Sequence, residues 1–171
     1  MKMKELLSNN EEYIQFIENQ HNWYWKVIDN IGWYYLAKEY KDEASDKVSE
    51  FLVNNNLSIE EIANLHNFVV EKREIVKNFI LSYLRSCPSH EKVKYKLNEE
   101  ETWDLASHIV GMGKVIMDLV LRKPEIIFIL QNIKQANFEY GFDSAIYKIQ
   151  NEDFSLFSII KLLFMNEKRK Y

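Results

Sequence analysis

The stretch between Ser58 and Pro88 restricts the fold more than any other part of the sequence. Ser58 precedes Glu61 by three residues, which is the pattern of a capping box that opens a helix. Apolar residues then recur at helical spacing as far as about Leu84. Cys87 and Pro88 end the pattern, because proline lacks a backbone donor and disfavours helix in the preceding residue. The sequence therefore predicts one long amphipathic helix, against which the remaining elements must pack.

The rest of the chain also favours helices. Its 171 residues include four glycines and two prolines, too few for the many tight turns of a sandwich, barrel or doubly wound sheet. Apolar spacing predicts further helices over residues 11–35 (interrupted near 19–22), 44–52, 99–121, 126–138, 143–149 and 154–164. Strict alternation at residues 92–97 indicates an extended loop, or a strand that pairs with a partner. We expect an all-α, single-domain helical bundle of about six to eight helices over residues 1–171, with at most one short extended segment near 92–97.

Capping and turn residues predict where these helices begin and end. Ser8 starts a second capping box, and Asn98 precedes three glutamates that favour a helix start. Residues 54–56 are asparagines, which tolerate the left-handed conformation that closes helices. Gly141 should close the helix before it, and Asp143 should cap the next one.

The formal net charge of −4 is unevenly distributed. Residues 1–64 carry twelve acidic and six basic side chains, whereas residues 65–97 carry seven basic and three acidic ones. Nucleic-acid binders are usually basic, so nucleic acid is expected only if it contacts the basic segment 72–96. No uncharged stretch reaches the roughly 20 residues of a membrane span, and residues 1–10 lack the apolar core of a signal peptide. These features and the single cysteine predict a cytoplasmic protein with no membrane partner.

Six aromatic residues crowd into thirteen positions, and this aromatic cluster is the most unusual local feature of the sequence. One helix face cannot hold all six, because successive side chains point in different directions. Two interpretations are open: a thick aromatic core whose hydroxyls reach its rim, or an exposed surface that anchors a partner. An acidic rim around exposed anchors would favour a basic partner. The members are Trp23, Tyr24, Trp25, Trp33, Tyr34 and Tyr35.

No complete catalytic signature accompanies these features, and no cofactor is indicated. The main hypothesis is a non-catalytic protein-binding or regulatory module of adaptor, immunity or inhibitor type. Its partner would be another protein, with a homodimer as an open alternative. The Lys-, Asn- and Ile-rich composition suggests an AT-rich genome and a phage or mobile-element origin. The aromatic cluster would form the contact surface, continued by Lys92, Lys94, Tyr95 and Lys96.

The alternative hypothesis is an enzyme. Arg85 is followed after four residues by His90, and the pair suits RNA cleavage because histidine titrates near neutrality and arginine holds phosphate through a planar fork. The pair is similar to the Arg-x4–6-His signature of HEPN domains, helical bundles many of which dimerise and cut RNA. The resemblance covers six residues and implies a metal-independent endoribonuclease. Arg85 would then hold the phosphate, and His90 would act on the ribose hydroxyl or the leaving group.

Two further alternatives concern metal and DNA. Glu18 and His21 have the Glu-x-x-His spacing that places two ligands on one helix face in di-iron bundles. Asp104 with His108 is their nearest counterpart. Residues 57–76 look like part of the helix-turn-helix of a DNA-binding regulator. The apolar stripe runs unbroken through the supposed turn, however, which favours a single helix.

Overall fold

The computed structural model describes residues 2–88, 95, 97–132 and 138–151, with side chains described from residue 14 onward. All regular secondary structure in these ranges is helical, so the predicted all-α bundle is confirmed. Residues 140–151 form a helix. None of the described helices is both long enough and apolar enough to cross a bilayer. The other elements are α1 (Lys2–Ile31), α2 (Trp33–Tyr40), the 3-10 turn η1 (Lys41–Glu43), α3 (Ala44–Asn54), α4 (Ile59–Ser86), α6 (Glu99–Gly111), α7 (Lys114–Arg122), the 3-10 turn η2 (Pro124–Ile126) and α8 (Ile127–Leu130).

The long helix α4 forms as its capping box predicts. Glu61 donates its backbone N–H to Ser58 Oγ at 3.2 Å, and its carboxylate Oε2 accepts the Ser58 backbone N–H at 2.8 Å. The helix ends at Ser86, and the backbone of Cys87 after it is extended (ψ 138°) ahead of the proline. Because α4 is continuous over its full length, it contains no turn of the helix-turn-helix kind.

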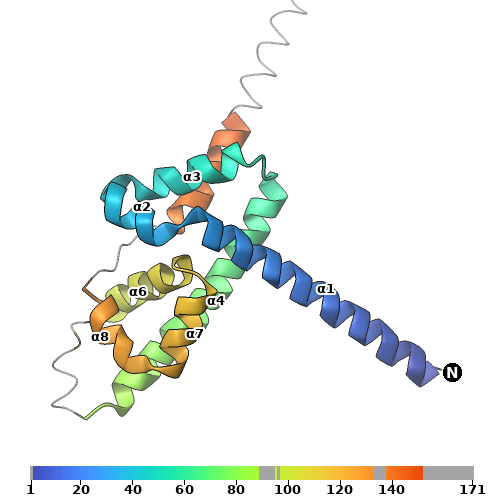
Figure 1. Cartoon of the computed structure of the whole chain (residues 1–171), viewed down its shortest axis with the longest axis horizontal. Helices are drawn as coiled ribbons and strands as arrows, with labels where there is room; N and C mark the ends of the chain where they lie inside the picture. The colour runs from blue at the N-terminus through green and yellow to red at the C-terminus, as the bar shows by residue number, and fades with distance from the viewer. Residues whose placement is uncertain (1, 89–94, 96, 133–137, 152–171) are drawn as a thin grey trace, which may run out of the picture.

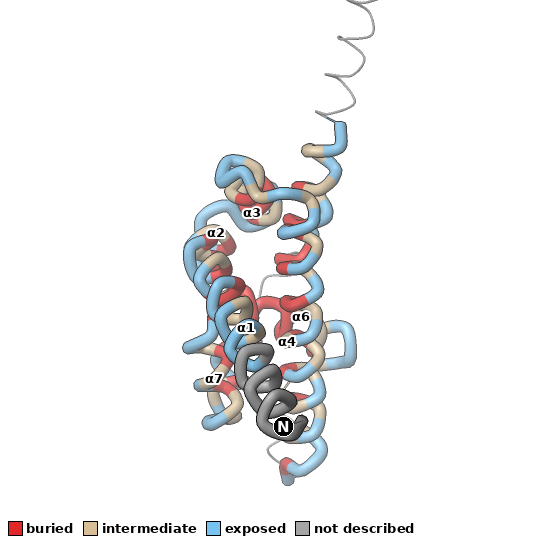
Figure 2. The backbone as a smooth tube through the Cα atoms, turned by 90° about the vertical axis from the view of Figure 1, so that its right-hand side faces the viewer, coloured by how far each residue is buried: buried red, intermediate tan, exposed pale blue. Residues whose placement is uncertain are grey.

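The other helices pack around α4 (Figure 1). α6 lies alongside it, α2 and α3 form a pair near one end, and α7 and α8 lie toward the other end. α6 is largely buried, with eight of its thirteen residues in the core. Buried residues gather on the inward faces of the helices (Figure 2), whereas the amino-terminal half of α1 extends away from the bundle (Figure 1).

Two glycines explain where predicted boundaries were wrong. Residues 99–121 do not form one helix, because Gly113 has a positive φ (96°) that separates α6 from α7. Gly113 also packs against Asp29 of α1, where a Cβ would collide. Gly32 (φ 67°) separates α1 from α2, so the break lies there and not near residues 19–22.

The chain around Gly141 also differs from the prediction. α8 ends at Leu130, short of the expected length, and the predicted cap Asp143 lies inside the helical residues 140–151. Gly141 lies inside them too, and it packs so closely on Val48 of α3 that a Cβ would collide. This glycine therefore permits close packing of two helices and does not close one.

The remaining boundaries are mixed. α1 begins at Lys2, before the predicted cap at Ser8. The asparagine stop after α3 is confirmed, with Asn56 in a left-handed conformation (φ 55°). The start of α6 is also confirmed, because Asn98 and Glu101 form a capping box with two 2.8 Å hydrogen bonds.

Candidate binding groove

The aromatic cluster divides into two halves. Three of its members are buried in the core: Trp33, Tyr24 and Trp25. Three are exposed: Trp23, Tyr34 and Tyr35. The buried Tyr24 and Trp25 pack against the ring of Phe68 on α4, whereas the exposed tyrosines contact each other on α2. The cluster is thus neither wholly core nor wholly surface.

Trp33 has a polar partner inside the core. Its indole Nε1 donates a hydrogen bond to Nδ1 of His108 on α6 at 2.9 Å, and its ring packs against Phe138. Burial lowers the pKa of His108 from 6.5 to about 4, because the interior disfavours the charged imidazolium. His108 is therefore neutral near pH 7 and accepts the indole hydrogen bond through one ring nitrogen.

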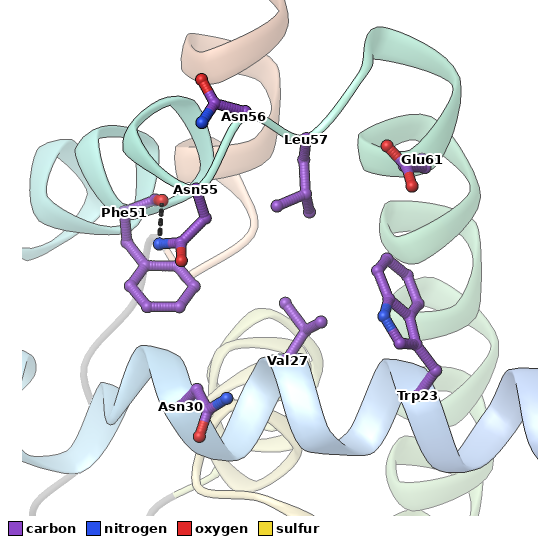
Figure 3. A pocket seen from close by; sticks show the side chains of 8 residues that line it. All are labelled: Trp23, Val27, Asn30, Phe51, Asn55, Asn56, Leu57 and Glu61. Carbon is purple, nitrogen blue, oxygen red and sulfur yellow. Dashed lines mark hydrogen bonds between the residues drawn. The ribbon is translucent and has the colours of Figure 1, made fainter.

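A hollow opens where α1 passes the connection between α3 and α4 (Figure 3). Its volume is about 280 Å³, and a hollow of about 180 Å³ adjoins it, since Trp23 and Glu61 line both. We call the two hollows together the Trp23 groove. Trp23 rises from α1 beside the first turn of α4, which carries Glu61 (Figure 3). The other lining residues are Gln20, Tyr24, Val27, Asn30, Phe51, Asn55, Asn56, Leu57 and Asn64.

The connection between α3 and α4 shapes this groove. Asn55 Nδ2 donates a hydrogen bond to the Phe51 carbonyl at 2.8 Å and so caps the end of α3. Asn56 then takes its left-handed conformation, which asparagine adopts more readily than most residues. The chain reverses within these few residues. As a result Leu57 projects from the connection toward Val27 of α1 (Figure 3).

Glu61 is the charged residue of the groove, and no basic side chain lines it in the described part of the chain. Its Oε2 accepts hydrogen bonds from the backbone N–H and from the hydroxyl of Ser58, both at 2.8 Å. These bonds lower the pKa of Glu61, because they favour the carboxylate. The groove therefore presents an indole face, several amide side chains and one ionised carboxylate.

The residues of the enzyme hypothesis are described only in part. Arg85 is exposed in the last turn of α4, and His90 lies outside the described residues. Whether the two form a cleft therefore stays a prediction. Other predicted features that lie outside the described ranges are Lys92, Lys94, Lys96 and the helix over residues 154–164.

Tyr95 is half-buried and belongs to the packing between α4 and α8. Its hydroxyl lies 3.2 Å from the hydroxyl of Tyr83, and its ring meets Phe128 edge to face. The hydrogen bond with Tyr95 and burial together raise the pKa of Tyr83. Neither Tyr95 nor Leu97, the two described residues of the alternating segment, belongs to a helix or strand.

The residues of the metal hypothesis have separate surroundings. Glu18 is exposed on α1, whereas His21 packs its ring against Phe68 with centroids 5.1 Å apart. Asp104 lies one turn before His108 on α6, and His108 accepts the indole hydrogen bond. Within the described ranges, no three His, Cys, Asp or Glu residues come together as a metal site.

Part of the basic segment is neutralised within α4. Lys72 Nζ lies 2.8 Å from Glu71, and Lys77 Nζ lies 2.6 Å from Glu74. Arg73 contributes little charge to the surface, because its side chain is only 10% exposed. These contacts reduce the positive charge that the sequence places at the start of residues 72–96.

Arg73 takes part in a buried ion pair. Its Nη1 donates to Oε2 of Glu139, and its Nη2 donates to Oε1 of Glu74 at 2.9 Å. The guanidinium lies over the ring of Trp103, 4.5 Å from the centroid. His66 completes the surroundings, with Nε2 3.8 Å from Glu139 Oε2. A planar cation held between carboxylates and an indole face is a favourable arrangement for arginine.

Sequence reasoning found Trp23 and Tyr24 but missed the rest of the groove. It interpreted Glu61 as a helix cap and residues 54–56 as a helix stop, and both features do form. The repeated asparagines were the one available sign of a polar lining. No local pattern could place them beside residues 20–30, because that contact depends on how α1 passes the α3–α4 connection.

Comparison of the chain with protein-family models, with curated proteins and with solved structures found no match.

Proposed function

We propose that the chain is a non-catalytic binding module that holds another protein at the Trp23 groove. The observation that carries the proposal is Trp23 itself, which leaves 37% of its surface exposed at the wall of a hollow. Burying a large aromatic side chain is favourable, so an indole left in this position is typical of a residue that a partner covers.

The lining of the groove supports a protein partner over a small molecule. Amide side chains such as Asn30 and Asn64 can hydrogen-bond to the backbone of a partner chain. An aromatic anchor within a polar rim is the usual anatomy of a protein interface.

The chemistry of the lining supports a non-catalytic role. The carboxylate of Glu61 is engaged by Ser58 in the cap of α4. Among the lining residues that the structure describes there is no histidine, cysteine, serine or lysine. A nucleophile with an adjacent base, which covalent catalysis requires, is therefore missing from this lining.

An adaptor, immunity protein or inhibitor is the role that best suits such a module. The proposal includes a cytoplasmic location, and the support for it is a single cysteine, Cys87, which is free and buried. A phage or mobile-element origin is supported only by the composition of the chain.

Affinity capture with matched variants tests the proposal. The wild-type chain, Trp23→Ala and Tyr147→Ala are immobilised and exposed to lysate of the native host. Tyr147 is the control because it is 69% exposed and does not line the groove. We expect one protein to be retained by the wild type and Tyr147→Ala and lost by Trp23→Ala, whose helical circular dichroism persists.

Equal retention by all three chains would refute the proposal. Light scattering on the purified wild-type chain covers the homodimer alternative. Self-association that Trp23→Ala abolishes would identify a second copy as the partner.

A further inference from the structure

Resting on this proposed function, we infer that the Trp23 groove receives an arginine side chain of the partner protein. The guanidinium lies flat against the Trp23 indole and donates hydrogen bonds to the Glu61 carboxylate and to nearby amide oxygens.

Charge complementarity selects a cation. Glu61 is ionised at neutral pH, and among the described lining residues no lysine or arginine opposes it. Its Oε2 accepts both hydrogen bonds from Ser58, so Oε1 remains as a further acceptor. An indole is also the aromatic ring that attracts cations best.

The amide side chains add acceptors. Asn55 Nδ2 donates a hydrogen bond to the Phe51 carbonyl, which leaves Asn55 Oδ1 as an acceptor. Asn30 projects from α1 on the same side of the hollow (Figure 3). A guanidinium carries five N–H donors and no acceptor, so it suits a lining rich in acceptors.

The core of the protein already contains the matching arrangement. Arg73 lies over the Trp103 ring at 4.5 Å while donating to the carboxylates of Glu139 and Glu74. The Trp23 groove supplies the indole and the carboxylate of that arrangement without the guanidinium. Arginine fits better than lysine, because a planar fork can stack on the indole and bond the carboxylate at once, whereas an ammonium is a point charge.

A short peptide is the probe. Acetyl-Gly-Gly-Arg-Gly-Gly-amide is titrated into the full chain, with lysine and citrulline peptides as matched controls, because citrulline keeps the shape of arginine and removes the charge. The chain has four tryptophans and therefore four indole N–H signals in an NMR spectrum. Trp23→Phe identifies the signal of Trp23.

We expect the arginine peptide to shift the Trp23 signal in a saturable way. The citrulline peptide should bind at least about tenfold more weakly, because charge-assisted hydrogen bonds are roughly twice as strong as neutral ones. The lysine peptide should bind about threefold more weakly or worse. No shift up to about 20 mM arginine peptide, or equal binding of either control peptide, would overturn the inference.

Two charge variants sharpen the test. Glu61→Gln removes the charge but keeps a capping-box residue at this position of α4, so the helix start is preserved. Glu60→Gln is the matched control, since Glu60 is an exposed neighbour that does not line the groove. We expect Glu61→Gln to bind the arginine peptide at least about fivefold more weakly, and Glu60→Gln to bind it as the wild type does. Equal binding by both variants would contradict the inference.

The inference and the proposed function fail in different ways. If lysate capture loses the partner with Trp23→Ala but keeps it fully with Glu61→Gln, the groove remains the binding site and the arginine inference is overturned. If Trp23→Ala still retains the partner, the proposed function itself fails, whatever the peptide does.

Discussion

Trp23 and Trp33 stand ten residues apart in one aromatic cluster, yet they lie in opposite environments. Trp33 has no exposed surface, whereas Trp23 leaves 37% of its surface exposed at the wall of the groove. Trp33 follows Gly32, whose left-handed backbone turns the chain between α1 and α2, and it packs against α6, whereas Trp23 lies on an exposed part of α1. Residue type and local density therefore do not decide whether such an aromatic is core or surface, because α1 and α2 each carry buried and exposed members of the cluster; the helix face that each position occupies does.

The two indoles also differ in the charge beside them. Trp33 donates its N–H to a neutral histidine, which satisfies a buried donor without burying a charge. Trp23 lies beside an ionised carboxylate, Glu61, at the surface. The inner indole thus holds the fold together, and the outer one is available to a partner.

Removing the inner indole is expected to have the largest effect. Trp33→Ala deletes a fully buried ring and leaves a cavity beside Phe138, so the free energy of unfolding should fall by about 3–5 kcal/mol. Urea unfolding followed by circular dichroism measures the loss. Trp33→Phe, which keeps most of the ring volume, should lose less. A loss no greater than that of Trp23→Ala would contradict the comparison.

Acidification should have the next largest effect on stability, through His108, the hydrogen-bond partner of Trp33. Burial holds the pKa of His108 near 4, below 6.5 in the unfolded chain, so the unfolded chain binds the proton more tightly. Neutral His108 thus contributes about 3 kcal/mol to the free energy of unfolding, a contribution that is complete above pH 6.5 and is lost as the pH falls toward 4. Unfolding at several pH values measures it. His108→Asn should flatten this part of the profile, and an unchanged slope between pH 6.5 and 4 would count against the buried neutral histidine.

Filling the space around Trp33 should lower the stability of the fold by somewhat less than acidification does. An alanine Cβ at Gly111 would lie 2.7 Å from the Trp33 ring and 3.0 Å from Phe138. Overpacking costs about 1–3 kcal/mol, while replacing glycine by alanine inside a helix gains up to about 1 kcal/mol. We expect a net loss of stability for Gly111→Ala in thermal unfolding, because the enclosed ring has no room to move. A rise in Tm would show that the packing there is loose.

Removing the outer indole should change stability least. Trp23 is partly exposed, so Trp23→Ala should cost about 1 kcal/mol or less in urea unfolding. Its partner binding should nevertheless be lost, which separates a binding residue from a core residue. A loss of several kcal/mol would place Trp23 with Trp33 in the core and would remove the contrast between them.

Local signals in the sequence were sufficient for much of the fold. The capping box at Ser58, and Asn98 with the glutamates that follow it, correctly located the starts of α4 and α6. The sequence did not locate the break at Gly113, because apolar spacing continues through it and the residue that packs on Gly113, Asp29, lies on another helix. Gly141 was misread for the same reason, since close packing on Val48 requires it.

The candidate site was predictable only as a stretch of chain. The aromatic cluster predicted a contact surface within residues 23–35, and Trp23 is the exposed member of the cluster that lines the groove. Glu61 and Asn55 were visible as a cap and a stop, and nothing in their spacing marks them as neighbours of Trp23.

The sequence by itself determined the helical class, the limits of the long helix and the density of aromatic residues in the first third. These features follow from capping, proline and apolar spacing, which act within a few residues of the chain. Only the tertiary structure decided that Trp33 is core, that Trp23 lines a groove and that Glu61 lies beside it. Those outcomes depend on contacts between helices far apart in sequence, where the turn at Gly32 and the reversal at Asn56 direct the chain.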